Sequence, residues 1–373
     1  MAALFWFLGS LLAWCYAGYP AAVLLRARLR PRPPPHGESD GAPVSVVLVV
    51  RDEAARMEGR LRDLLAQDGV GEVVVVCDGC TDGTEQVARA AALHDARVRV
   101  LGTARRGKAA GVNVGVAAAE NPLVVFADAR QRFAPGAVRA LAAPFAHPRV
   151  GAVTGRLRIG AATGAVEGVR WYWGMETALR VAEGRTGSVV GATGAIYAVR
   201  RALFEPLPPG LILDDVLVPM RVAMRGCRVA MAADAVAFDT PSRDPAAEYR
   251  RKRRTMLGNL QLLLVCPALL LPWRNPLWAR FVSHKLLRVA SPACCVGMLA
   301  ASAVLPGPVY RLAFAGLAAV YAAGAAGLVA RWRPLALPAA FLLMHAAVFS
   351  AFLHPWRDAA DAWAPRPAEA GRG

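Results

Sequence analysis

The sequence has little charge and almost no lysine. Charged residues make up 19% of the 373 residues and hydrophobic ones 56%, against about 25% and about 45–50% in soluble domains. A disordered chain and a purely soluble protein are therefore excluded. Only Lys108, Lys252 and Lys285 are lysines, so arginine supplies nearly all of the net charge of +17. Because no helix-turn-helix, zinc or RNA-binding pattern accompanies this charge, we expect no nucleic-acid partner.

Cysteine is also scarce and irregularly spaced. The seven cysteines are odd in number, which argues against a disulfide framework. Cys77 and Cys80 form a C-x-x-C pair, but no second pair lies nearby, and this disfavours a zinc site or a redox centre. Residues 102–108 have the G-x-x-x-x-G-K spacing of a phosphate-binding P-loop, but Ala109 lacks the hydroxyl that holds Mg²⁺ there. A P-loop ATPase is therefore disfavoured as well.

Long uncharged runs lie near both ends of the chain. Residues 1–25 carry no charged side chain and exceed the roughly 20 residues that cross a bilayer, so they predict an N-terminal transmembrane helix. Residues 26–43 form a basic, Pro-rich linker, whose arginines place the following domain on the cytoplasmic side. We expect an interfacial segment at 259–280, transmembrane helices (about three) at 281–355 and a polar tail at 356–373.

Residues 44–258 have alternating strand and helix patterns. Runs rich in β-branched residues at 44–50, 73–76, 98–101 and 123–126 alternate with helical stretches. Buried parallel strands have such continuous apolar runs, and the crossovers between them are helices. The pattern predicts an α/β domain with an open, mostly parallel sheet, in which ligands bind at the carboxyl ends of the strands.

Charged residues follow each of these four strands. They lie in the loops at residues 51–53, 78–82, 105–108 and 128–130. Carboxylates and cations that meet at one edge of a sheet suit a metal-bound phosphate ester. The alternative, solvated loops with ordinary surface charges, explains any one loop better than it explains all four.

Seven segments, in this order and spacing, resemble the motifs of family 2 glycosyltransferases. The first four are VSVVLVVRDEAA, VVVVCDGCTDGT, RRGKAAGVNVGVAAA and VVFADA, and the match continues with GATGAIYAVRRALF, LILDDVLVPMRVAMRGCRV and EYRRKRRTMLGN. The similarity covers residues 44–265 and is greatest to the membrane-integrated branch, which includes cellulose, chitin and hyaluronan synthases and bacterial exopolysaccharide glycosyltransferases. It implies a GT-A-type sheet domain flanked by transmembrane helices.

The resemblance implies a binding site for a nucleotide sugar. Glu53 and Asp78 match the acidic residues that hold the nucleoside, and Lys108 is a cation for the diphosphate. Asp128 matches the first aspartate of the D-x-D motif, which binds Mg²⁺ or Mn²⁺. Arg130 replaces the second aspartate, which leaves the metal one protein ligand short. Its planar guanidinium can pair with phosphate instead, and the alternative is a surface arginine.

The resemblance also implies a catalytic and acceptor site. Asp214 and Asp215 follow an apolar run at 211–213, which we expect to be a strand, and match the T-E-D motif. Asp215 is then the general base, and Asp214 contacts donor and acceptor. Two adjacent carboxylates are also favoured at a helix N-terminus.

The basic run at 250–254 stands in the place of the family's Q-x-x-R-W motif. Arg254 matches the arginine, which contacts the diphosphate, whereas Arg251 and Thr255 replace the glutamine and the tryptophan at the acceptor. Without the tryptophan, which stacks on a growing sugar chain, we do not expect long-polymer processivity. The alternative for the basic run is a juxtamembrane patch that binds anionic lipid.

These residues predict an inverting glycosyltransferase. An acceptor hydroxyl needs a carboxylate base to attack the anomeric carbon, and a metal at Asp128, with Lys108 and Arg254, can stabilise the leaving diphosphate. A single displacement with one base inverts the anomeric centre. The expected donor is a nucleotide sugar, with a UDP-sugar as the first candidate. The expected acceptor is a glycan or a lipid-linked acceptor, and the expected process is surface-polysaccharide synthesis.

The expected location is the inner (plasma) membrane, which the chain crosses several times with its catalytic domain in the cytoplasm. Membrane lipids and an export machinery are the expected partners there. The alternative function is a catalytically inactive family member that acts as a scaffold or nucleotide-sugar sensor, because Arg130 and Thr255 replace two motif residues. The retained Asp215 favours activity.

Overall fold

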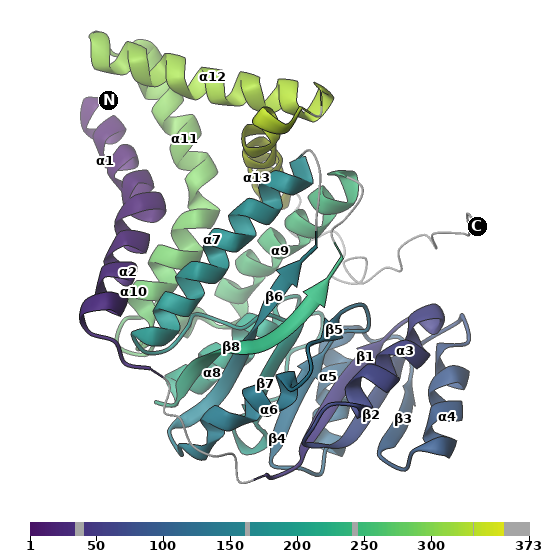
Figure 1. Ribbon diagram of the computed structural model, residues 1–373. Helices are drawn as coiled ribbons and strands as arrows, with labels where there is room; N and C mark the ends of the chain where they lie inside the picture. Colours follow the sequence, from purple (N-terminus) through teal and green to yellow (C-terminus); the bar gives the residue numbers. More distant parts are fainter. Residues whose placement is uncertain (34–40, 161–164, 241–244, 331, 354–373) are drawn as a thin grey trace. The chain divides into compact units, whose positions relative to one another are not determined.

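The computed structural model describes residues 1–33, 41–160, 165–240, 245–330 and 332–353 (Figure 1). Contacts divide the chain into two compact units. The sheet unit contains residues 32–158 and 187–239, and the helical unit contains residues 1–31, 159–186 and 240–355. Each unit is therefore assembled from separate stretches of the chain.

This division differs from the contiguous domain expected at 44–258. Two helices within or across that range, α7 (Ala165–Arg185) and α9 (Pro245–Val265), belong to the helical unit. They pack on two apolar helices, α2 (Tyr19–Leu29) and α13 (Ala336–Leu353). α9 also runs without interruption across the boundary expected between residues 258 and 259.

The described residues of the sheet unit form a mixed eight-stranded sheet of order β3-β2-β1-β4-β7-β6-β8-β5. Its strands are β1 (Val44–Val50), β2 (Val70–Asp78), β3 (Val98–Thr103), β4 (Leu123–Ala127), β5 (Arg132–Phe133), β6 (Val150–Ile159), β7 (Ile196–Arg200) and β8 (Arg228–Asp239). The first four strands pair in parallel, whereas β7 is antiparallel to β4 and β6, and β5 is antiparallel to β8. The expected α/β fold is confirmed, and each of the four expected strands lies within one of the parallel strands.

Helices connect these strands (Figure 1). They are α3 (Ala54–Leu65), α4 (Thr84–His94), α5 (Lys108–Ala118), α6 (Ala137–Ala142) and α8 (Asp214–Met224), with 3₁₀ turns at Ala143–Ala146 and Arg201–Leu203. Every residue of β1 is buried, which explains its continuous run of apolar side chains. The strand expected at 211–213 is wrong: these residues lead into α8, because the two carboxylates that follow favour a helix N-terminus.

Two glycines let α5 lie close against the sheet. A Cβ atom at Gly111 would be 2.5 Å from Cγ1 of Val49, and one at Gly115 would be 2.4 Å from Cγ1 of Val47. Both distances are well inside the carbon–carbon contact distance of about 3.5–4.0 Å, so a larger residue would push the helix away. This packing sets how close α5 lies to the sheet, and the first residue of α5, Lys108, belongs to the candidate site.

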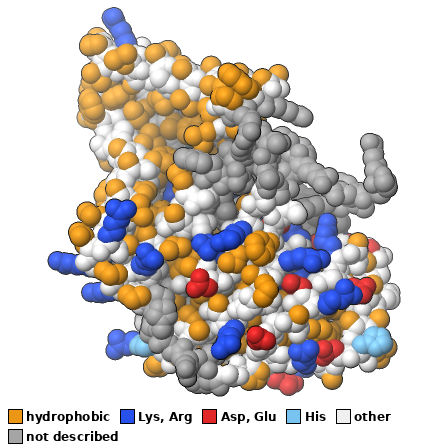
Figure 2. Space-filling view, in the orientation of Figure 1, with side chains coloured by type: hydrophobic (Ala, Val, Ile, Leu, Met, Phe, Trp, Pro, Cys, Tyr) orange, Lys and Arg blue, Asp and Glu red, His pale blue; other side chains and the backbone are white. Residues whose placement is uncertain are grey.

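Four helices of the described chain are long and apolar enough to cross a membrane: Ala2–Leu29, Trp278–Val304, Pro308–Ala330 and Ala336–Leu353. The first two are built from α1 (Ala2–Ala13) and α2 joined by a π-helical turn at Trp14–Gly18, and from α10 (Trp278–Phe281) and α11 (Leu287–Val304) joined by another at Val282–Leu286. The third is α12 (Pro308–Ala330), and 3₁₀ turns lie at Pro267–Leu270 and Arg333–Leu335. Figure 2 shows hydrophobic side chains gathered over α1 and α12, as lipid contact requires.

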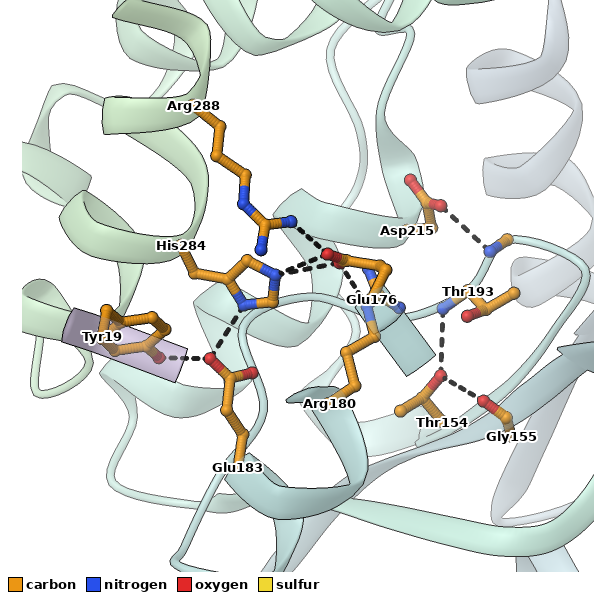
Figure 3. A network of polar contacts seen from close by, with 11 residues as sticks. Tyr19, Thr154, Gly155, Glu176, Arg180, Glu183, Thr193, Asp215, His284 and Arg288 are labelled. Atoms are coloured by element: carbon orange, nitrogen blue, oxygen red, sulfur yellow. Dashed lines mark hydrogen bonds and ion pairs between the residues drawn. The ribbon is translucent and has the colours of Figure 1, made fainter. Parts of the chain in front are cut away.

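A charged network is buried inside the helical unit (Figure 3). The ring of His284 lies between Glu183, whose Oε1 is 2.8 Å from Nδ1, and Glu176, whose Oε1 is 2.9 Å from Nε2. An ionised carboxylate only accepts hydrogen bonds, so both ring nitrogens donate and the imidazole is charged. Arg288 also donates to Glu176, and Tyr19 donates to Glu183. The network therefore ties α2, α7 and α11 together.

Loss of the central cation should destabilise the helical unit. His284→Ala leaves two buried carboxylates without it, and breaking a buried ion pair costs about 3–5 kcal/mol. We expect a lower Tm in detergent, measured by thermal unfolding. Arg311→Ala, which alters an exposed arginine of α12, should leave the Tm unchanged. If His284→Ala has the Tm of the wild type, the network contributes no stability.

Candidate active site

The loops after β1 and β2 are joined by hydrogen bonds. Asp52 Oδ1 accepts from Thr81 N at 2.7 Å, and Glu53 N donates to Thr84 Oγ1 at 2.8 Å. Asp52 adopts a φ of 51°, which is uncommon for a residue other than glycine. These contacts hold Glu53 at the carboxyl end of β1, where its carboxylate lies 2.6 Å from Nη1 of Arg56.

Asp78 is the last residue of β2 and is fully buried. Its Oδ1 accepts from Arg106 N at 2.7 Å, and its Oδ2 accepts from Gly107 N at 2.9 Å. The loop after β3 is thereby tied to the end of β2, and Lys108 follows directly. Asp78 therefore anchors this loop. The contact of Asp78 with a nucleoside stays a prediction.

Lys108 brings together two carboxylates from distant segments. Its Nζ is 3.1 Å from Oδ1 of Asp128, directly after β4, and 3.5 Å from Oδ1 of Asp214, the first residue of α8. Burial lowers the pKa of Lys108, but the surrounding carboxylates, including Asp215, outweigh burial and raise this pKa above its ordinary value. The ammonium therefore stays charged and lets carboxylates share a site in which they would otherwise repel each other.

Asp214 is also held from its other side. Tyr197 of β7 donates to Oδ2 of Asp214 at 3.2 Å, and its buried ring stacks on Phe126 with centroids 4.5 Å apart. Burial and the charge of Asp214 raise the pKa of Tyr197 well above its ordinary value, so its hydroxyl stays a donor. Both oxygens of Asp214 therefore have partners, and the carboxylate is fixed in position.

Asp215 contacts a different element from its neighbour. Its Oδ2 accepts from Gly194 N at 2.9 Å, and its backbone oxygen accepts from Ala192 N at 2.6 Å. Figure 3 shows the carboxylate directed at this loop. A Cβ atom at Gly194 would lie 3.1 Å from Oδ2, so glycine allows the amide to come this close. The loop before β7 therefore orients Asp215.

Sequence reasoning missed two residues that hold the loop after β4. Arg60 of α3 is 3% exposed and donates through Nε to the backbone oxygen of Asp128 at 3.0 Å, and burial lowers its pKa to about 10. Asp63, which lies one turn after Arg60 on α3, accepts a hydrogen bond from Phe133 N at 3.1 Å and forms an ion pair with Arg60. The spacing of this pair by three residues was the available signal, but exposed pairs on the same helix have similar spacing.

Arg130 pairs with a carboxylate that no motif had indicated. Its Nη2 is 3.0 Å from Oδ2 of Asp239, the last residue of β8. Gln131 donates to the same oxygen through Nε2 at 3.1 Å. The assignment of Arg130 to a phosphate stays a prediction, and the structure shows which carboxylate balances its charge.

Arg251, Arg254 and Thr255 lie on α9 of the helical unit. Thr255 donates through Oγ1 to the backbone oxygen of Arg251 at 3.0 Å, so its hydroxyl is used within the helix. Their contacts with an acceptor and a diphosphate stay predictions. The sheet unit itself brings together Lys108, Asp128 and Asp214 from the expected set.

The oxygen ligands of the sheet unit suit a divalent cation that is bound together with phosphate. Mg²⁺ in such sites uses one or two carboxylates and takes its other ligands from phosphates and water. Asp128 has the required carboxylate, with 32% of its side chain exposed. Within the described ranges, no group of three His, Cys, Asp or Glu side chains could hold a metal ion by itself. A metal at Asp128 would take its other ligands from phosphate oxygens and water.

Removal of the ammonium should destabilise the sheet unit. Lys108→Met leaves the carboxylates of Asp128 and Asp214 facing each other without a cation, and the loss of a hydrogen bond to a charged group costs about 1.5–3 kcal/mol. We expect a lower Tm at neutral pH and partial recovery as acid protonates the carboxylates, measured by thermal unfolding across pH. Arg139→Met, which removes an exposed cation of α6, should have no such effect. A pH-independent loss would contradict the electrostatic explanation.

The fold is similar to that of a solved mannosyltransferase. Mannosyltransferase PcManGT from Pyrobaculum calidifontis, in complex with GDP-Man and Mn²⁺, matches with a TM-score of 0.68 and 24% sequence identity. The match covers 94% of this chain and 98% of that chain. The expected GT-A-type sheet with flanking apolar helices is thereby confirmed.

Sequence comparison gives the family. The succinoglycan biosynthesis protein ExoU of Rhizobium meliloti (strain 1021) is 34% identical over 94 residues, which are 25% of this chain and 28% of that protein. The match thus spans little more than a quarter of this relative. Residues 42–258, more than half of the chain, match the family described as glycosyltransferase like family 2. The chain belongs to this family of glycosyltransferases.

Proposed function

We propose that the chain is an inverting glycosyltransferase that moves a sugar from a nucleotide-sugar donor to a glycan or lipid-linked acceptor. The observation that carries this proposal is the group of carboxylates, Asp128, Asp214 and Asp215, around the ammonium of Lys108. The group lies at the carboxyl end of β4, the edge at which open α/β sheets bind their ligands. One cluster thus offers a carboxylate base and charges for a diphosphate.

The donor is a nucleotide sugar, and we propose a UDP-sugar. The mannosyltransferase of similar fold was solved with GDP-Man and Mn²⁺, which supports a nucleotide-sugar donor and a divalent metal here but leaves the base open. In our proposal, Glu53 and Asp78 hold the nucleoside, and Lys108 contacts the diphosphate.

Asp128 would hold Mg²⁺ or Mn²⁺ with the donor. A metal bound there would neutralise charge that develops on the leaving diphosphate. Lys108 supplies a second positive charge from the protein itself, because its Nζ is 3.1 Å from the same carboxylate. The backbone bond from Arg60 at 3.0 Å keeps the loop with Asp128 in place.

Asp215 is the proposed general base. The hydroxyl of an acceptor has a pKa far above neutrality, so its attack needs a carboxylate that takes the proton. The amide of Gly194, 2.9 Å from Oδ2, orients this carboxylate. Asp214 is committed to Tyr197 and Lys108, and we therefore give it a positioning part. One base suffices for a single displacement, which inverts the anomeric carbon.

The acceptor is proposed to lie beside Asp214 of the sheet unit, at the cytoplasmic face of the inner membrane. Four apolar helices support a place in a membrane, and the arginines at 26–32 next to the first of them favour the cytoplasmic side. The relative ExoU is named for succinoglycan biosynthesis, which supports a part in surface-polysaccharide synthesis with an export machinery as partner.

A second candidate function is a nucleotide-sugar sensor or scaffold without catalysis. It is favoured by Arg130, which stands in the place of the second metal aspartate and pairs with Asp239. Turnover separates the two functions, because a sensor binds the donor without releasing the nucleoside diphosphate.

Asp215→Asn should abolish turnover and leave donor affinity near that of the wild type, because the base acts only when the acceptor attacks. We expect kcat to fall by about 10²–10⁴-fold. The assay is the release of nucleoside diphosphate in detergent with Mn²⁺, from UDP-, GDP- and dTDP-sugars. Asp234→Asn, a change of an exposed carboxylate on β8, should keep full turnover.

Two further variants locate the base within the pair. Asp128→Asn should weaken Mn²⁺-dependent donor binding, and Asp214→Asn should lower kcat less than Asp215→Asn does. Transfer that survives in Asp215→Asn but not in Asp214→Asn would move the base by one residue. Transfer that survives in both would overturn the assignment of α8 as the catalytic element.

A further inference from the structure

Two buried side chains of the sheet unit and one partly exposed arginine form a polar cluster. Asp239 ends β8, and Arg130 and Gln131 lie in the loop after β4. The pairing of β5 with β8, in which Arg132 is opposite Phe238, brings the two segments together. Oδ2 of Asp239 takes both contacts, from Nη2 of Arg130 at 3.0 Å and from Nε2 of Gln131 at 3.1 Å.

Each of these side chains leaves one buried polar atom without a hydrogen-bond partner in the described part of the chain. The atoms are Nε of Arg130, Oε1 of Gln131 and Oδ1 of Asp239. Gln131 is 1% exposed and Asp239 is 5% exposed, so the fold withdraws both acceptors from bulk water. A buried polar atom without a partner is costly. The cluster therefore has hydrogen-bonding capacity that the described side chains do not use.

The unused atoms define the chemistry of a partner. Oδ1 and Oε1 need hydrogen-bond donors, and Nε of the guanidinium needs an acceptor. A phosphate offers acceptors only and would be repelled by Asp239, whereas a metal cation would be repelled by Arg130, 3.0 Å from the same carboxylate. Hydroxyl groups both donate and accept, and a sugar carries them in neighbouring pairs. The cluster fits carbohydrate hydroxyls.

The position of the cluster points to the sugar of the donor. Gln131 is three residues after Asp128, in a loop that α3 holds at both ends through Arg60 and Asp63. In the proposed function Asp128 lies at the donor diphosphate, to which the transferred sugar is directly bonded. Arg130, with 29% of its side chain exposed, is the member of the cluster that an incoming group meets first.

We propose that Arg130, Gln131 and Asp239 form a subsite for the hydroxyl groups of the donor sugar and so select which sugar is transferred. Hydroxyls donate to Oδ1 of Asp239 and Oε1 of Gln131, and one hydroxyl oxygen accepts from Nε of Arg130. This contact replaces the predicted contact of Arg130 with phosphate. This subsite rests on the proposed function, because it assumes that Asp128 binds the donor diphosphate.

The test compares the affinity for a nucleotide sugar with that for its nucleoside diphosphate. Full-length protein in detergent with Mn²⁺ is titrated in a calorimeter with the UDP-, GDP- or dTDP-sugar that the wild type binds best. Asp239→Asn should weaken the affinity for the nucleotide sugar by about 10- to 100-fold, as expected for the loss of hydrogen bonds to a charged group. Its affinity for the nucleoside diphosphate should equal that of the wild type, which also reports an intact fold.

Gln131→Met and deoxy-sugar donors give a second, independent measurement. The wild type should lose affinity when one sugar hydroxyl is removed from the donor, and Gln131→Met should be insensitive to loss of the hydroxyl that Gln131 holds. Gln67→Met is the matched control, because Gln67 is also buried but accepts from Val138 N at 3.4 Å elsewhere in the sheet unit. This control should bind both ligands as the wild type does.

The outcomes separate the subsite from the proposed function. The subsite would be overturned if Asp239→Asn bound the nucleotide sugar with the affinity of the wild type. It would also be overturned if Asp239→Asn lost affinity equally for the nucleotide sugar and for the nucleoside diphosphate. A change confined to the Mn²⁺ requirement or to the KM for the acceptor would overturn it too. A wild type that binds no nucleotide would overturn the proposed function and the subsite with it.

Discussion

The candidate site depends on one ammonium group between carboxylates. Asp128 and Asp214 come from distant parts of the chain, and without a cation their charges would drive them apart. Lys108 reaches both, at 3.1 and 3.5 Å, because it is the first residue of a helix that Gly111 and Gly115 allow to lie against the sheet. The packing of α5 and the geometry of the site are therefore a single constraint. A larger side chain at either glycine would move the ammonium away from its carboxylates.

The sequence predicts the parallel half of the fold well and the antiparallel half poorly. Parallel strands buried on both faces need continuous apolar runs, and these are visible at 44–50 and 123–126. Charged residues after each run also predict where Lys108 and Asp128 meet. The pairing of Arg130 with Asp239 could not be predicted, because it depends on how β5 aligns with β8. The periodicity of the sequence does not determine the register in which β5 pairs with β8.

The distribution of charge follows the two units. Residues 1–31, 159–186 and 240–355, the helical unit, contain nineteen Lys or Arg and five Asp or Glu. The net charge of +17 thus lies mainly in the unit with the four apolar helices, which suits a membrane surface better than a nucleic acid. Two of the five acidic residues, Glu176 and Glu183, are buried around His284. Burial raises the pKa of Glu176, but the charges of His284 and Arg288 outweigh burial and hold this pKa well below its ordinary value.

The configuration of the product is the most direct test of Asp215 as the single base. A single displacement with Asp215 as base inverts the anomeric carbon, whereas a double displacement through a covalent glycosyl-enzyme retains its configuration. Proton NMR of the first glycoside formed from an α-linked nucleotide sugar distinguishes the two anomers by their coupling constants. We expect a β-linked product, with transfer lost in Asp215→Asn. An α-linked product would contradict the single-base mechanism that the arrangement of Asp214 and Asp215 supports.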